Sequence, residues 1–333
     1  MGIFNKNKGE MKENIWNEIK KINWKKVNKD SLMDFKINYI GDIESLTVFI
    51  TELEKSKYDF FGVKLDKENA LTAKAREKII FIDINKIENI KIDNNNSEIN
   101  IVDNKYINKV REKTKIRKYY IFNSILTEEN IEEIINDHEE LTPALGFNYP
   151  ALRAIASRKK ITEIAIQNGV WAAGSSFANI IPGPHQIVTA PLEGASDFTV
   201  LTANELRMIF ITAGISGRII EPLKLIPELV IMISGAKGAQ MLATQSIGKI
   251  PVGAGNILKG AIAFAFTFAI GEAVFLNINY GIKIDSKKIA ERVKVLEEFS
   301  KEKISKFIKK KKQDSEESID VESVETEQVM NDN

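Results

Sequence analysis

Residues 260–278, GAIAFAFTFAIGEAVFLNI, restrict the fold of this chain more than any other stretch. As a helix, these 19 residues would be about 28 Å long, close to the roughly 30 Å hydrocarbon core of a bilayer. Glu272, near the middle, would cost about 2.5–3.5 kcal/mol on an insertion scale, by analogy with Asp, and would offset most of the apolar contribution. The stretch is therefore a marginal membrane span, a hairpin within one leaflet, or a buried helix of a bundle.

Small residues recur at every fourth position in three segments of the second half. This spacing forms a shallow ridge along one face of a helix, over which another helix backbone can approach closely. The sequence therefore predicts at least three tightly packed helices, separated by proline-containing turns. The ridges consist of Ala165, Gly169 and Ala173, of Gly235, Ala239 and Ala243, and of the helix-packing ridge Ala261, Ala265, Ala269 and Ala273.

The first half alternates strand and helix patterns, which favours a small α/β domain. Residues 34–40, DFKINYI, alternate as a strand does, and residues 45–55 repeat apolar side chains with helical spacing. Residues 87–93 and 98–103 flank three asparagines and are interpreted as a hairpin. Further strands are predicted at 78–84 and 117–123, and a helix at 127–140.

The loop after the first predicted strand lacks the residues that hold nucleotide phosphates. A P-loop needs G-x-x-x-x-G-K-[ST], whose backbone N–H groups, lysine and hydroxyl bind phosphates and magnesium. Residues 40–49, IGDIESLTVF, lack the second glycine and the lysine, and Asp42 and Glu44 would repel a triphosphate. Asn85-Lys86-Ile87-Glu88 and Asn123-Ser124-Ile125 are faint echoes of guanine-binding GTPase motifs. A degenerate G domain and an unrelated α/β sandwich both fit, and we expect neither to bind nucleotide.

The predicted fold class is α+β with two domains, a small α/β (degenerate G-domain-like) N-terminal domain followed by an all-α, Ala/Gly-rich helical bundle. The last 21 residues hold eight acids and no base, too polar to offset the entropy of ordering. The expected organisation is a basic amphipathic N-terminal helix at 1–30, a small α/β domain without a P-loop at 31–142, a helical domain at 143–283, an amphipathic basic helix at 284–312 and a disordered acidic tail at 313–333.

The residues that the chain lacks exclude several chemistries. There is no cysteine, which removes disulfides, thiolate metal sites and cysteine nucleophiles. The two histidines, His138 and His185, are far apart in the sequence, so neither a zinc centre nor a Ser-His-Asp triad is expected. The net charge of +1 does not point to nucleic acid. We predict a non-enzymatic protein with no catalytic, cofactor-binding or metal-binding residues, and no cofactor.

Polar residues in the apolar second half form a candidate structural polar cluster. They would make a functional polar site, or they would satisfy one another at a helix junction, which is the commoner arrangement. Within a bundle, one of them, Glu272, would be protonated or paired with Lys249, Lys259 or Arg207. The cluster consists of Asp197, Asn204, Glu205, Arg207 and Glu272.

Residues 145–282 resemble the YcjF-like family, a helical domain of unknown function that usually follows an Era-like GTPase domain in bacteria and is often described as membrane-associated. The more specific pieces are Tyr149-Pro150-Ala151-Leu152-Arg153, Asp197 with Leu201-Thr202 and Asn204, Met208, Gly217-Arg218, and Lys259-Gly260-Ala261 with Thr267 and Gly271. The chain departs from the family pattern at Glu205 and Ser216, and it lacks a competent GTPase domain upstream. The resemblance implies architecture and membrane association, but no catalytic residue.

These observations predict a non-enzymatic YcjF-like protein that is associated with membrane lipid and acts through an unknown protein partner or self-association. It would lie on the cytoplasmic side of the cell membrane, attached peripherally or by an inserted hairpin. Its basic segments, 12–29 and 301–312, would suit anionic lipid. The alternatives are a soluble cytoplasmic helical scaffold or homo-oligomer, and a GTPase-related switch.

Overall fold

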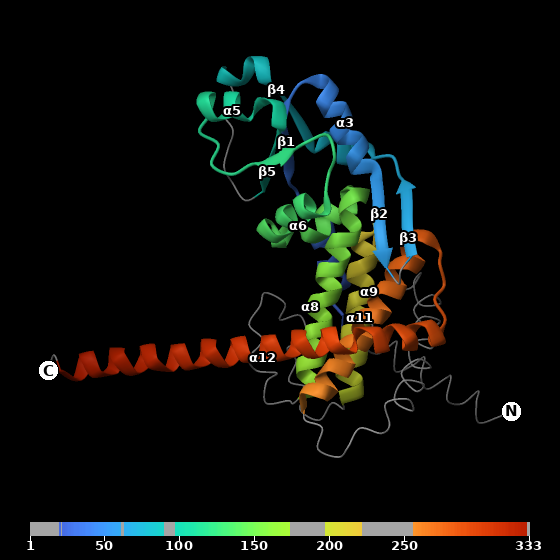
Figure 1. Ribbon diagram of the computed structural model, residues 1–333, viewed down its shortest axis with the longest axis vertical. Coiled ribbons are helices and arrows are strands. Elements are labelled where there is room, and N and C mark those ends of the chain that lie inside the picture. Colours follow the sequence, from blue (N-terminus) through green and yellow to red (C-terminus); the bar gives the residue numbers. More distant parts are fainter. Residues whose placement is uncertain are drawn as a thin grey trace.

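The protein has a parallel α/β sheet region followed by a helical region, as the sequence predicted (Figure 1). The upper part of Figure 1 contains the sheet, and the long helices α8, α9 and α11 run side by side below it. The computed structural model describes residues 20, 22–60, 63–89, 97–173, 197–221 and 256–331.

Four parallel strands form the sheet in the order β4-β1-β5-β6. The strands are β1 (Lys36–Gly41), β4 (Ile79–Asp83), β5 (Glu98–Asp103) and β6 (Tyr120–Phe122). The other elements of this region are α3 (Ile43–Glu54), α4 (Ala73–Glu77), η1 (Ile84–Asn89), η2 (Asn104–Tyr106), α5 (Ile107–Lys113), α6 (Glu128–Asp137) and a separate antiparallel pair, β2 (Lys55–Phe60) and β3 (Val63–Glu68).

The hairpin predicted across the three asparagines is wrong. Strand β5 pairs in parallel with β1, with Ile37 opposite Ile99, and η1 occupies the start of the other predicted arm. Residues 99–103 are all buried, as in a parallel strand that is covered on both faces. The asparagine turn suggested a hairpin because a local turn signal does not reveal which strands pair. The β2–β3 hairpin was not predicted.

Apolar side chains cover both faces of the sheet. On one face, Val102 packs with Ile84 and with Val110 of α5. On the other face, Tyr39 stacks on Phe49 of α3 with ring centroids 4.9 Å apart. This second face also contacts the helical region, because Ile215 belongs to the same core. The two regions therefore share one core, and the expected domain boundary at 142/143 lies inside it.

A short connection of helical turns joins the two regions. It contains η3 (Glu139–Leu141), α7 (Thr142–Asn148) and η4 (Pro150–Leu152). Tyr149 is fully buried, and its hydroxyl donates to the carbonyl of Ala75 at 3.1 Å. The Arg153 guanidinium donates from Nε to the carbonyl of Gly146 at 3.1 Å, which satisfies an open carbonyl near the end of α7. Sheet and helices are thus fixed to each other by both apolar and polar contacts.

Helix α11 forms the axis of the helical region. It packs most extensively on α8 and α12, and also on α9. Ala261, Ala265 and Ala269 are buried, and Ala273 is half-buried. The helices are α2 (Trp24–Ser31), α8 (Arg153–Ala173), α9 (Asp197–Ile215), α11 (Asn256–Tyr280) and α12 (Ser286–Asn331).

Helices α8 and α11 approach each other most closely at two glycines. A Cβ added to Gly260 would lie 2.5 Å from the carbonyl oxygen of Gly169, and one added to Gly169 would lie 2.8 Å from that of Gly260. Backbone meets backbone here, so no side chain could move aside. The crossing therefore requires glycine in both helices.

Helix α12 continues through the acidic segment to Asn331 (Figure 1), and the disordered tail at 313–333 stays a prediction. Glutamate is a good helix former, and the tail continues a helix that is already nucleated and packed on α11. Most of the predicted helix at 1–30, and the ridge Gly235, Ala239 and Ala243, lie outside the described residues.

We expect Asp42→Ala to lower the free energy of unfolding by about 1 kcal/mol, because Asp42 is the N-cap of α3. Its Oδ1 accepts from the Ser45 backbone N–H at 2.7 Å, and that bond is the main cause of a lowered pKa of the Asp42 carboxyl. A lowered pKa means that the charge stabilises the fold above the ordinary value near 3.8, and this stabilisation is lost as pH falls through the folded-state pKa. Urea unfolding of the parent and the variant from pH 7 to pH 2 measures this loss of stability. Asp42→Ser should retain most of the stability, because serine is also a good N-cap residue. Equal losses of unfolding free energy in Asp42→Ala and Asp42→Ser would contradict the capping role.

We expect Gly260→Ala to destabilise the protein by about 1–3 kcal/mol through overpacking at the glycine crossing. At an exposed helical position the same change would stabilise by about 1 kcal/mol, so the sign is diagnostic. Thermal unfolding followed by circular dichroism measures it. Ala263→Gly, at a half-buried position of α11, is the control, because it measures the effect of helix propensity alone. A Gly260→Ala variant as stable as the parent would show that the helices need not approach so closely.

Candidate functional site

The carboxyl end of the sheet is the usual ligand position in an open parallel α/β fold, at the point where the strand order reverses. Here that point lies between β1 and β5. Asp42, the residue between β1 and α3, caps α3 and also accepts from the Tyr106 hydroxyl through Oδ2 at 2.9 Å. A Cβ at Gly41 would lie 2.9 Å from Ser45 Oγ and 3.2 Å from Asp103 Cβ. The position is filled by protein atoms and carries carboxylates, which does not suit a phosphate.

The two echoes of guanine-binding motifs do not come together. Asn85 follows β4, at one edge of the sheet, whereas Asn123 follows β6, at the opposite edge. Three strand spacings separate these edges, or about 14 Å. The Asn85 side chain lies 3.5 Å from Lys109 Nζ, and the Asn123 side chain lies 3.4 Å from Asn104 Nδ2. Each asparagine contacts its own part of the protein, so the pair makes no base-binding site.

The predicted polar cluster is divided among several places in the helical region. The Asn204 amide donates to Asn168 Oδ1 at 2.7 Å, and the Asn168 amide donates to Thr267 Oγ1 at 2.8 Å. This chain of amides links α9, α8 and α11 inside the bundle. Glu205 is buried, and the side chain of Asp197 lies outside the described residues.

Glu272 forms an ion pair that the sequence analysis missed. Its carboxylate accepts two hydrogen bonds from Arg292 of α12, from Nε at 2.8 Å and from Nη2 at 2.9 Å. The side chain of Glu272 is 2% exposed and that of Arg292 is 25% exposed. The predicted partners of Glu272 were Lys249, which lies outside the described residues, Lys259 and Arg207, and they did not include Arg292. Position 292 follows a helical reversal at Gly281, where φ is +69°, and only the fold brings it back to α11.

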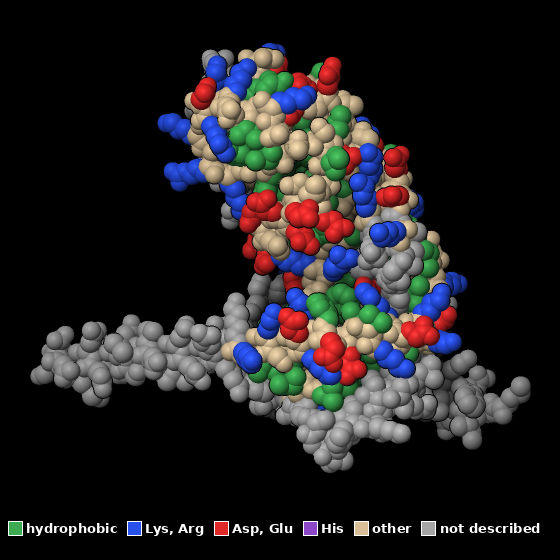
Figure 2. All heavy atoms as spheres, in the orientation of Figure 1, with side chains coloured by type: hydrophobic (Ala, Val, Ile, Leu, Met, Phe, Trp, Pro, Cys, Tyr) green, Lys and Arg blue, Asp and Glu red, His purple; other side chains and the backbone are tan. Residues whose placement is uncertain are grey.

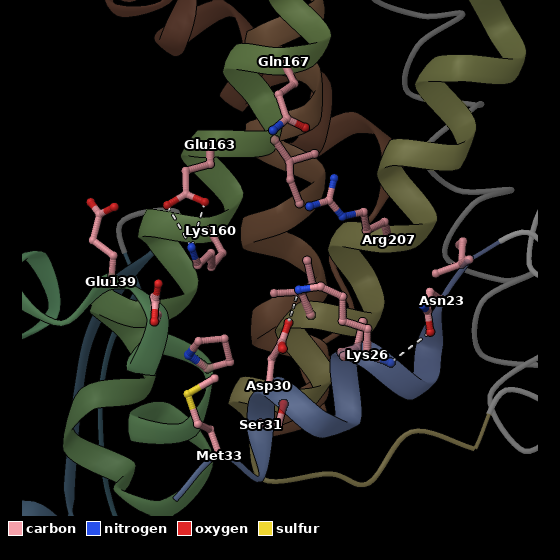
Figure 3. A pocket seen from close by; sticks show the side chains of 16 residues that line it. Asn23, Lys26, Asp30, Ser31, Met33, Glu139, Lys160, Glu163, Gln167 and Arg207 are labelled. Carbon is pink, nitrogen blue, oxygen red and sulfur yellow. Dashed lines mark hydrogen bonds and ion pairs between the residues drawn. The ribbon is translucent and has the colours of Figure 1, made fainter. Parts of the chain in front are cut away.

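Arg207 lies in a pocket between α2, α8 and α9, and this pocket is the candidate functional site (Figure 3). The pocket has a volume of about 180 Å³. The Arg207 side chain extends from α9 towards α8, where Glu163 and Gln167 also line the pocket. Its apolar lining consists of Ile22, Val27, Met33, Pro143, Ile164 and Ile211.

Most of the charged groups around this pocket already have partners. Lys160 Nζ lies 2.9 Å from Glu163 Oε2, and Lys26 Nζ lies 3.3 Å from Asp30 Oδ2. Among the buried charged groups of the lining, Arg207 is the exception, since its Nε has no hydrogen-bond partner within the described part of the chain. Burial lowers the pKa of the Arg207 guanidinium, and the charges of Glu163 and Asp30 partly oppose this effect.

The sequence analysis identified Arg207 but not its pocket. Lys160 and Glu163 are three residues apart on α8, a spacing that places them on one helix face, so the ion pair could have been predicted. The contribution of α2 could not, because Lys26 and Asp30 are distant in sequence from α8 and α9. Within the described ranges, no group of three or more His, Asp or Glu residues could hold a metal ion.

Comparisons of the chain with protein-family models, with curated proteins and with solved structures found no match.

We expect Glu272→Ala to destabilise the protein by about 3–5 kcal/mol, because it leaves Arg292 beside the core without its carboxylate. The double variant Glu272→Met/Arg292→Met should cost much less, since two apolar side chains replace both charges. Chemical denaturation of the parent, both single variants and the double variant gives the coupling energy. Glu302→Ala, which breaks the exposed Glu302–Lys306 pair, is the control and should change little. Additive single effects would contradict a coupled pair.

Proposed function

We propose that the protein is a non-enzymatic helical scaffold that acts by binding a partner, with α11 as the axis of an intramolecular core. The observation that carries the proposal is the enclosure of α11 by α8, α9 and α12, with Glu272 paired to Arg292. The resemblance of residues 145–282 to the YcjF-like family belongs to this proposal. Two of the pieces that carry it, Tyr149–Arg153 and Gly217-Arg218, lie near the connection between the sheet and helical regions.

The environment of α11 favours a core helix over a membrane span. Among the described helices, α11 has a length and composition compatible with crossing a membrane, over Ile257–Tyr280, with a mean hydropathy of 1.9 and 72% of the window buried. Insertion would exchange protein contacts for lipid contacts of similar polarity and would separate Glu272 from Arg292. The carboxylate alone would then cost about 2.5–3.5 kcal/mol at the bilayer centre. Moving α11 from the protein into lipid would therefore gain little free energy and would lose the ion pair between Glu272 and Arg292.

The sheet region supports a binding role rather than a catalytic one. Its usual ligand position holds Asp42 and Asp103 and is filled by neighbouring side chains. On the face drawn in Figure 2, Lys and Arg side chains are interspersed with Asp and Glu side chains. Such a mixed surface favours a protein partner over nucleic acid. The exposed side chains of α12 between Ser286 and Lys309 offer a surface for such a partner or for a second copy of the chain.

Fractionation of the expressed protein tests whether α11 is a core helix. We expect the protein in the soluble fraction, or released from membranes by a carbonate wash at high pH. Release by carbonate would leave α11 in the core and would assign lipid contact to the basic segments 12–29 and 301–312. Carbonate resistance that only detergent overcomes would overturn the proposal.

A matched variant sharpens this experiment. Glu272→Leu/Arg292→Leu removes both charges, which makes α11 a better membrane span while keeping an apolar contact with α12. If α11 is a core helix, the variant should fractionate like the parent. A shift of the variant into the carbonate-resistant fraction would indicate that α11 leaves the bundle for lipid.

A further inference from the structure

Two residues that line the pocket between α2, α8 and α9 each have a buried polar atom without a hydrogen-bond partner within the described residues. Arg207 is 6% exposed and Ser31 is 1% exposed. Neither Arg207 Nε nor Ser31 Oγ has a hydrogen-bond partner within the described residues. Both residues line the pocket, Ser31 from α2 and Arg207 from α9 (Figure 3). Buried polar groups are nearly always hydrogen-bonded, so an unsatisfied guanidinium nitrogen beside a pocket indicates a place for a ligand. Ser31 Oγ carries less of the argument, because it lies against Gly214 of α9.

Among the buried charged side chains of this pocket, Lys160 and Arg207, the guanidinium lacks an ion-pair partner within the described residues. Lys160 and Lys26 have carboxylates within ion-pair distance, at Glu163 and Asp30 respectively. Glu139 is engaged by Lys159, which lies 2.8 Å away. A guanidinium has five N–H donors and cannot lose its charge, so its burial without a partner carries a large desolvation cost. An apolar side chain would fill this place at lower cost if stability were the only requirement.

We propose that this pocket binds a small molecule with one carboxylate, whose oxygens accept hydrogen bonds from Arg207. A planar carboxylate matches the fork of a guanidinium with two parallel hydrogen bonds. The short apolar body of the molecule lies against Val27, Ile164 and Ile211, on the apolar part of the lining. This inference is independent of the proposed scaffold role, because fractionation does not measure ligand binding.

The charge balance of the lining favours a carboxylate over a phosphate. Three cations, Lys26, Lys160 and Arg207, and four carboxylates, Asp30, Glu139, Glu140 and Glu163, line the pocket. Lys26 pairs with Asp30, Lys160 pairs with Glu163, and Glu139 pairs with Lys159. Glu163 and Asp30 remain close enough to Arg207 to affect its pKa. A dianionic phosphate would be attracted by one cation that is unpaired within the described residues, Arg207, and repelled by these two carboxylates. A ligand with a single negative charge balances Arg207 and meets less of that repulsion than a dianion does.

The test uses the full chain and three probes that each contain six carbon atoms in an unbranched chain: hexanoate, hexan-1-ol and hexyl phosphate. Isothermal titration calorimetry and the shift of the melting temperature both report binding to the folded state. We expect hexanoate to bind at least tenfold more tightly than either of the other probes. Equal affinities for hexanoate and hexan-1-ol would overturn the proposal, because the pocket would then recognise only the apolar body. Tighter binding of hexyl phosphate would overturn the choice of a carboxylate.

Variants separate a ligand-binding role of Arg207 from a structural one. Arg207→Met should weaken hexanoate binding at least tenfold while the melting temperature without ligand stays equal or rises. A large loss of melting temperature together with unchanged hexanoate binding would overturn the proposal. Arg218→Met, which removes an exposed guanidinium outside the pocket, is the matched control and should bind hexanoate as the parent does.

A second variant tests the apolar half of the pocket with the guanidinium in place. Ile211 is half-buried and lines the pocket, so Ile211→Phe should fill part of the space by enlarging an apolar side chain. We expect hexanoate to bind this variant at least fivefold more weakly, with Arg207 intact. Unchanged affinity in Ile211→Phe would place the carboxylate site elsewhere and overturn the assignment to this pocket.

Discussion

The helical region depends on the close contact between α8 and α11. Two glycine backbones, at Gly169 and Gly260, meet at distances that leave no room for a side chain. This approach brings Asn168 within hydrogen-bond distance of Thr267, so a polar contact reinforces the packing on the same side of the bundle. Helix α12 then covers another face of α11 and places Arg292 against Glu272. An apolar helix that carries a carboxylate is thereby accommodated within the protein.

The sheet region is fixed to this bundle by a core that both regions share. Tyr149 is buried where α7 and η4 meet the sheet, and Ile215 at the end of α9 contributes to the same apolar cluster. Arg153 satisfies a carbonyl near the end of α7 and also lies next to Gly217, whose φ of +85° follows α9. A side chain at Gly217 would be strained and would crowd the Arg153 guanidinium, so glycine suits this turn. Motion of one region relative to the other would have to disrupt this core.

The polar residues of the helical region have two different relations to their surroundings. Glu272 and the amides of Asn168 and Asn204 are satisfied by partners on neighbouring helices, so they stabilise one arrangement of the bundle. Arg207, on the same helix as Asn204, lacks such a partner at Nε and faces a pocket instead. The contrast within one helix distinguishes groups that hold the protein together from a group that is available to bind something else.

Local patterns in the sequence determined the elements, while contacts between distant segments decided their partners. Alternation in residues 34–40 and helical spacing in residues 45–55 predicted β1 and α3, because these signals come from neighbouring side chains. The parallel pairing of β5 with β1 could not be predicted from a turn of asparagines, since register depends on the whole sheet.

The same division holds for the candidate site. Glu272 stood out in the sequence as a carboxylate in an apolar run, and Arg207 as a cation in a region with few charges. Their environments depend on α12 and α2, which lie far away in the chain. The sequence by itself determined that these two charged side chains lie in an apolar part of the chain, where a buried charge is costly unless it is paired. Only the tertiary structure decided that Glu272 has a partner while Arg207 faces a pocket, because burial and pairing are set by segments that meet only after folding.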